Sequence, residues 1–158
     1  MKTFIYLATF VAAQMFTVNA IAQKYKGPAD TVKLNREYMT MSNDIVSLTA
    51  KLTEAQNDLP GIKEKAGSAD NRAQDAANSS SNRANEATDG GVKDAKRAKR
   101  SANNAYKKAK SSQSAEADVK RQEKKIAKIS SDLARKQKRL EELNVMRTAI
   151  YSMLPAQQ

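Results

Sequence analysis

A row of apolar residues, spaced alternately four and three positions apart, constrains this chain more than any other feature. The row is continuous through the first half of the sequence: Leu34, Tyr38, Met41, Ile45, Leu48, Leu52, Ala55 and Leu59. Its phase continues, with alanine mostly replacing leucine: Ile62, Ala66, Ala69, Ala73, Ala76, Ser80, Arg83 and Ala87. This heptad spacing places one apolar face along a helix that packs lengthwise on a partner. We predict one long helix, with a kink or a brief break at Pro60, because proline removes a backbone hydrogen bond.

A second helix is predicted after Asp89-Gly90-Gly91, the strongest turn signal in the chain. Apolar residues recur beyond the turn: Ala95, Ala98, Ala102, Ala105, Ala109, Val119, Ile126, Ile129, Leu133, Leu140, Leu143, Ile150 and Leu154. The phase of the alanines would bring Glu116 and Glu123 onto the apolar face, so we expect an irregular row around Lys120. Lys136 and Arg147 occupy two of the remaining places, where long stems can lie along the row while the charges stay in water.

The two segments have similar lengths, about 30–88 and 92–154. Folding the chain at Gly90 sets alanines opposite alanines and leucines opposite leucines. We therefore predict an all-α fold, a long antiparallel coiled-coil helical hairpin of about 90 Å at roughly 1.5 Å per residue. Alanine buries little area, so the tip is expected to be weaker than the leucine-rich base. Disorder of residues 66–115 in the isolated chain is the alternative.

Residues 1–22 have the pattern of a secretory signal peptide. A basic start at Lys2 precedes an apolar stretch, and Ala20-Ile21-Ala22 fits a cleavage site that leaves Gln23 at the mature N-terminus. An uncleaved membrane anchor is the alternative, although Gln14 and Asn19 interrupt an apolar run that would need about 20 residues to span a bilayer. We expect export to the periplasm or the outside of a bacterial cell, with no transmembrane span in the mature chain.

The mature chain would have 136 residues, of which only 18 are Leu, Ile, Val or Phe. This is too few for an ordinary globular core and favours either a narrow helical seam or disorder. The predicted organisation is a signal peptide (1–22), a loose segment (23–29), the hairpin (30–154) and a loose tail (155–158).

The excess of positive charge lies wholly on the second arm. Residues 92–158 hold eighteen basic and seven acidic residues, whereas residues 23–91 hold nine and ten. The basic residues that we predict as an anion-binding site are Lys96, Arg97, Lys99, Arg100, Lys107, Lys108, Lys110, Lys120, Arg121, Lys124 and Lys125. Such a stripe suits an anionic polymer or a membrane surface. The alternative is a solvated helix face that keeps the protein soluble. Sequence-specific nucleic-acid binding is not expected, since Tyr106 is the only aromatic residue among these clusters.

The sequence lacks the residue types that most catalytic and metal sites use. It contains no Cys and no His, which removes thiolate chemistry, the commonest general base and the commonest metal ligand. We predict no catalytic residues, no metal, no cofactor and no enzymatic activity.

The size, the signal peptide, the basic balance and the long helical arms resemble those of the Skp/OmpH periplasmic chaperones. The trimers of that family hold unfolded outer-membrane proteins between helical tentacles. The resemblance lies in general character and not in a shared motif, and this chain lacks the strand-forming segments that build the trimeric body of that family. The prediction is a structural or interaction role in the cell envelope, as a scaffold or spacer that contacts a protein partner or self-associates through its leucine-rich base. An anionic-polymer-binding module and a Skp-like holding chaperone are the alternatives.

Overall fold

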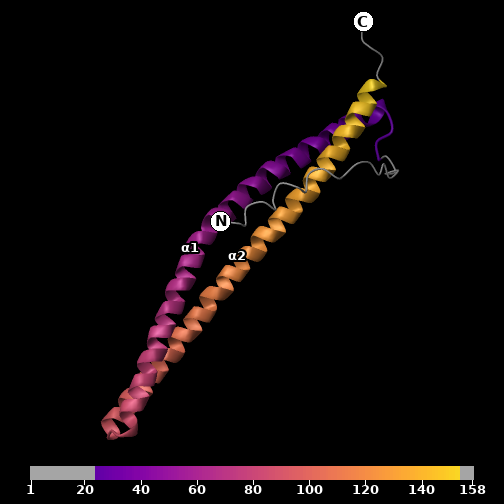
Figure 1. Ribbon diagram of the computed structural model, residues 1–158. Helices are drawn as coiled ribbons and strands as arrows, with labels where there is room; N and C mark the ends of the chain where they lie inside the picture. Colours follow the sequence, from indigo (N-terminus) through magenta and orange to yellow (C-terminus); the bar gives the residue numbers. More distant parts are fainter. Residues whose placement is uncertain (1–23, 154–158) are drawn as a thin grey trace, which may run out of the picture.

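The computed structural model describes residues 24–153, so the predicted signal peptide and tail lie outside the described residues. A short 3-10 turn, η1 (Pro28–Asp30), leads into helix α1 (Thr31–Thr88), which is followed by helix α2 (Val92–Ser152). Figure 1 shows the two helices folded back on one another as a thin, elongated molecule. The prediction of an all-helical chain with two long packed helices is confirmed, and the part of the chain that the structure describes contains no strand.

The turn lies where the sequence predicts it. Thr88 ends α1 and Val92 begins α2. Gly90 is needed for a steric reason, since a Cβ there would lie 2.9 Å from the Glu86 carbonyl oxygen and 2.9 Å from the Asp94 Cβ. The carbonyl oxygen of Gly91 accepts hydrogen bonds from the backbone N–H groups of Asp94 at 2.9 Å and Ala95 at 3.2 Å, which starts α2.

Pro60 bends the first helix without breaking it. Helix α1 is continuous through Pro60, and Figure 1 shows it bending part-way along its length, between its purple and magenta parts. Of the predicted kink or brief break, the structure therefore has the kink (Figure 1). Proline leaves the carbonyl four residues earlier, that of Gln56, without its helical partner. Both residues are exposed, so water can reach this part of the backbone.

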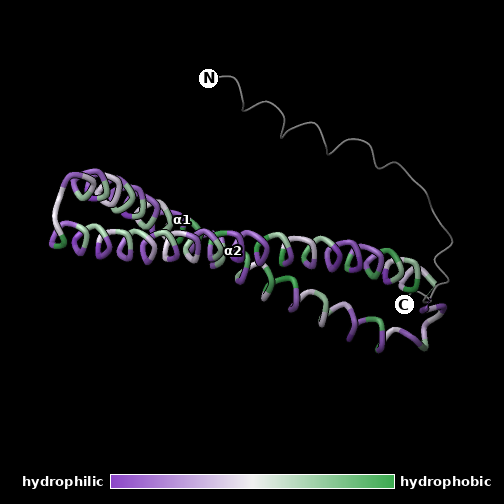
Figure 2. The backbone as a smooth tube through the Cα atoms, turned by 90° about the horizontal axis from the view of Figure 1, so that it is seen from below, coloured by the Kyte–Doolittle hydropathy of each residue, from purple (hydrophilic) through white to green (hydrophobic). Residues whose placement is uncertain are grey.

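The burial pattern of α1 follows the predicted apolar row. Every position of the row from Leu34 to Ala87 is buried or half-buried, apart from the exposed Arg83. Figure 2 shows apolar and polar residues alternating along both helices instead of separating into blocks. A narrow seam of this kind lets a chain with few large apolar residues bury most of them.

The predicted apolar row of α2 near the turn is right at Ala98 and Ala105, which are half-buried, and wrong at the other three alanines. Ala95, Ala102 and Ala109 are exposed. The inward row instead runs without interruption at steps of four and three: Asp94, Ala98, Ser101, Ala105, Lys108, Ser112, Ala115, Val119, Gln122, Ile126, Ile129, Leu133, Lys136, Leu140, Leu143, Arg147 and Ile150. The irregularity expected around Lys120 does not occur, because Glu116 and Glu123 lie outside this row and are exposed.

Several polar residues at inward positions of α2 form hydrogen bonds to α1. The hydroxyl of Ser112, which is only 6% exposed, donates to a carboxylate oxygen of Asp70 at 3.3 Å. The amide of Gln122 donates to the backbone carbonyl of Ala55 at 2.7 Å. Small side chains on α1 leave room for these contacts, so the seam continues where leucines are absent.

The main hydrophobic core lies at the open end of the hairpin. It consists of Tyr25, Leu34, Leu143, Met146 and Ile150, with Tyr38 and Met41 packed against it. The presence of Tyr25 corrects the prediction of a loose segment at 23–29, because this side chain is only 6% exposed. The aromatic ring covers the end of the seam, and this burial holds the segment around Tyr25 against both helices.

Candidate functional site

The most connected polar cluster lies beside this core and centres on Glu37. Its carboxylate accepts hydrogen bonds from Lys24 at 2.8 Å, from the Tyr25 hydroxyl at 2.5 Å and from Arg139 at 2.7 Å. Arg139 also pairs with Glu142 at 3.1 Å. One half-buried carboxylate therefore joins the N-terminal segment, α1 and α2, and we call Lys24, Tyr25, Glu37 and Arg139 the base clamp.

The clamp changes the acidity of Glu37. Burial alone would raise the pKa of this carboxyl, but the hydrogen bonds from Lys24, Tyr25 and Arg139 outweigh it and lower the pKa to about 2. The bond to Glu37 raises the pKa of the Tyr25 hydroxyl. Glu37 is therefore ionised at neutral pH, and the cluster acts as a structural tie between three segments.

The two basic residues predicted to lie on the α2 seam, Lys136 and Arg147, have partners in the protein. Lys136 forms an ion pair with Asp44 at 2.6 Å. The guanidinium of Arg147 lies 5.0 Å from the ring centre of Tyr38 and 5.5 Å from that of Tyr151, which is cation–π geometry. The expectation that these charges only reach water is wrong, and both contribute to packing at the base.

Two shallow grooves follow the helix–helix boundary. The first holds about 580 Å³ and is lined by Asp44, Ser47, Leu48, Lys51, Asp132, Arg135, Lys136 and Arg139. The second holds about 390 Å³ beside Ile62 and Gln122. Among residues 24–153, no group of three His, Cys, Asp or Glu side chains is placed to hold a metal ion. No helix in this range is long and apolar enough to cross a membrane.

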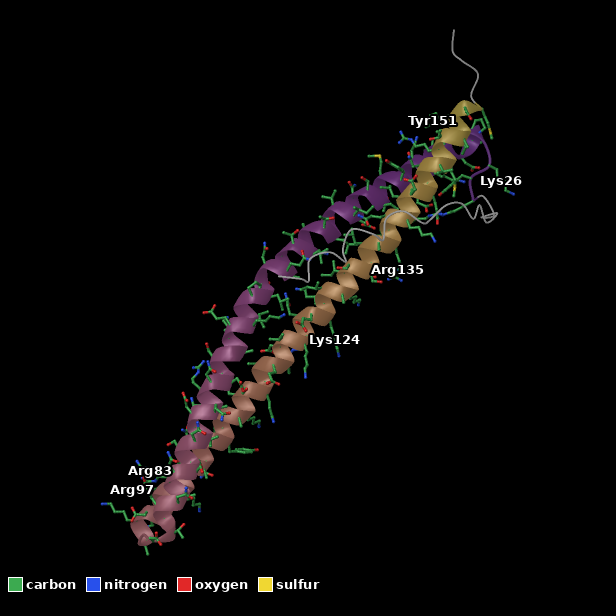
Figure 3. All side chains as sticks on the ribbon, in the orientation of Figure 1. Lys26, Arg83, Arg97, Lys124, Arg135 and Tyr151 are labelled. Carbon is green, nitrogen blue, oxygen red and sulfur yellow. The ribbon has the colours of Figure 1, made fainter. Side chains whose placement is uncertain are left out.

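The structure distributes the predicted anion-binding residues around α2 and does not gather them into a pocket. Ten of the eleven are exposed, whereas Lys108 is half-buried and points toward α1 as part of the inward row. Arg97 pairs with Asp94 and Arg121 with Asp118 on the same helix. Figure 3 shows Lys124 on the side of α2 that faces away from α1, and Arg97 near the turn. Lys108 is thus the one predicted site residue whose position argues against ligand contact.

An exposed apolar row on α1 was not predicted. Val32, Met39 and Val46 are spaced seven residues apart and are 72%, 64% and 68% exposed. Val32 and Met39 also line a shallow groove on α1, together with Asn35, Arg36, Thr40 and Asn43. The seven-residue spacing was visible in the sequence, but the stronger row of Leu34 to Leu59 obscures it. We call Val32, Met39 and Val46 the apolar stripe.

Comparisons with protein-family models, with curated proteins and with solved structures find no match to this chain. The resemblance to the Skp/OmpH chaperones therefore remains one of general character, and the hairpin itself is what supports a function.

Proposed function

We propose that this protein is an exported, non-enzymatic coiled-coil rod that serves as a scaffold or spacer in the cell envelope. Two helices of 58 and 61 residues, packed along a continuous seam, make a shape suited to separating or connecting partners. The open end of the hairpin, which we call the base, is the more firmly packed end of the rod, because it contains both the hydrophobic core and the base clamp.

A single observation carries the interaction role: the apolar stripe lies on the side of α1 that α2 does not cover. Its three large side chains stay more than half exposed in the hairpin. Isolated exposed apolar residues are common, but a row at heptad spacing supplies one of the two apolar positions per heptad that a further helix packs against. The stripe thus supports the predicted self-association through the base, although it uses the outer face of α1 and not the leucines.

A second copy of this chain is the partner that we propose for the stripe. In an antiparallel pair of α1 helices centred on Met39, Val32 of each copy would lie beside Val46 of the other, so each stripe would cover the other. Helix α2 does not offer this match, because its outer face is strongly basic and would repel its own copy.

Sedimentation equilibrium on mature protein tests this proposal, with two matched valine substitutions. Val46→Glu buries a charge in the proposed interface, so it should give monomers. Val145 is 61% exposed at the same end of the molecule but on α2, so Val145→Glu should leave the dimer intact. A monomeric wild-type protein, or equal loss of dimer in both variants, would contradict self-association through the stripe.

Export is tested separately, by the mass of the protein recovered from the cell envelope fraction. A chain that begins at Gln23 is expected. Replacing Ala20 and Ala22 with arginine should retain the full-length chain, because large charged residues do not fit a cleavage site of small residues. Full-length protein in the cytoplasm of unaltered cells would contradict the export proposal.

A further inference from the structure

The basic residues of α2 follow a regular repeat that its charge alone does not require. Pairs of basic residues three positions apart recur every fourteen residues: Lys93 and Lys96, Lys107 and Lys110, Arg121 and Lys124, Arg135 and Lys138. Residues three apart lie on the same side of a helix, and fourteen residues are two heptads. The four pairs, which we call the basic ridge, are therefore aligned along one side of α2.

The structure places the whole ridge in contact with solvent. All eight side chains are exposed, and none belongs to the inward row. The lysines of the first two pairs, Lys93, Lys96, Lys107 and Lys110, form no ion pair with a carboxylate of residues 24–153. In the other two pairs, Arg121 and Arg135 contact Asp118 and Asp132. At about 1.5 Å per residue, successive pairs lie roughly 21 Å apart over a total of roughly 65 Å.

We propose that the basic ridge binds a linear acidic polysaccharide that lies lengthwise along α2. An extended polyanion can place an anionic group at every pair, and it gains affinity by releasing counterions wherever it meets one. A regular repeat suits a ligand that is itself regular, whereas solubility requires only the net charge. This site does not depend on self-association, since it is on the other helix from the apolar stripe.

Two other anionic partners fit the ridge less well. Helices that bind in the plane of a bilayer carry a broad apolar face opposite their basic residues, but the face opposite the ridge is occupied by α1. Proteins that bind single-stranded nucleic acid stack bases on several aromatic side chains. Between Lys93 and Lys138, the only aromatic side chain is Tyr106, which is 70% exposed.

Heparin, a linear sulfated polysaccharide, is the probe for the test, with binding measured by calorimetry over a series of salt concentrations. The ridge variant K93Q/K96Q/K107Q/K110Q removes two complete pairs. The control K33Q/K51Q/K65Q/R72Q removes the same charge from exposed positions of α1. The ridge variant should bind roughly tenfold or more weakly, and its salt dependence should fall by about one unit of slope for each ligand-binding lysine replaced. The control should bind nearly as the unaltered protein does.

Equal weakening in both variants would overturn the proposal, because it would show that only net charge matters. Tighter binding to vesicles of anionic phospholipid, or to single-stranded DNA, than to heparin would also overturn it. A further arm uses heparin fragments of increasing length. Affinity should rise steeply once a fragment exceeds the roughly 21 Å between pairs, and a smooth rise through that length would contradict the repeat as the binding unit. Circular dichroism of both variants confirms that the helices are retained.

Discussion

The base and the tip of the hairpin hold the same two helices together by different means. At the base, Leu34 and Leu143 are completely buried, and ion pairs join Glu37 to Arg139 and Asp44 to Lys136 across the two helices. Toward the tip, the buried side chains of α1 are alanines: Ala66, Ala69 and Ala76. The ion pairs nearest the turn, Arg83 with Glu86 and Asp94 with Arg97, each lie within one helix.

The contrast indicates where the register of the hairpin is decided. Large side chains and cross-helix ion pairs fit only one alignment, whereas a row of alanines is nearly the same after a shift of one heptad. We infer that the contacts at the base determine which residues of α1 and α2 lie side by side. The alanines of the tip follow this alignment but do not select it. Substitutions at the two ends should therefore differ in their consequences.

Removing a leucine from the base should destabilise the protein most. Leu143→Ala should lower the free energy of unfolding by about 2–5 kcal/mol, because it removes buried methyl groups and leaves a cavity. The matched change at the tip, Ala69→Gly, should cost only about 1 kcal/mol, the usual penalty of glycine within a helix. Urea denaturation followed by circular dichroism measures both. Similar destabilisation of the two variants would contradict a base that dominates stability.

Acid should weaken the base through Glu37. A carboxyl whose pKa is lowered in the folded state stabilises the fold above its unfolded value, near 4.5, and loses that contribution as the pH falls toward about 2. We expect a loss of about 2 kcal/mol over this range, less than the full shift implies because the cluster is partly open to water. Glu37→Gln should flatten this part of the stability profile, whereas the exposed Glu54→Gln should not. An unchanged profile in Glu37→Gln would count against the clamp.

A smaller effect distinguishes the two possible phases of α2 at the tip. Ala105 is half-buried against α1, whereas Ala102 is exposed. Ala105→Glu should cost about 1–2 kcal/mol, because a carboxylate would lie in the seam without a partner. Ala102→Glu should stay within about 0.5 kcal/mol of the original protein. Thermal unfolding measures both variants, and an equally large loss in both would restore the phase that the alanines alone suggest, in which Ala102 also faces α1.

The sequence predicts the fold well where side chains are large and poorly where they are small. The row from Leu34 to Leu59 and the turn at Gly90 lead directly to the two helices and their antiparallel order. Near the turn, alanines are common on both the inward and outward faces of α2, so their spacing cannot identify the seam. Continuing the phase of Ile126 and Leu133 toward the turn does identify it, provided that Ser101, Lys108 and Gln122 are accepted as inward residues.

The polar contacts of the base were beyond sequence reasoning for a different reason. The base clamp brings together Lys24, Glu37 and Arg139, and Arg139 is more than a hundred positions from the other two. No local spacing links them, because they meet only after the hairpin closes. The apolar stripe and the basic ridge could both be found from the sequence, by searching each helix for a second heptad-spaced row on its outer side.

Spin-label distances between positions at the same level on the two arms test the hairpin and its alignment together. The protein contains no cysteine, so pairs introduced at exposed positions can be labelled cleanly: Arg36 with Asn144 at the base, Glu54 with Lys128 in the middle, and Asn78 with Asn103 near the tip. Packed helices should give roughly 20–40 Å for all three pairs, since their axes lie about 8–10 Å apart. Dilution with unlabelled protein removes distances between copies. A tip pair centred well beyond this range, or a base pair that varies more widely than the tip pair, would contradict a hairpin whose alignment is fixed at the base.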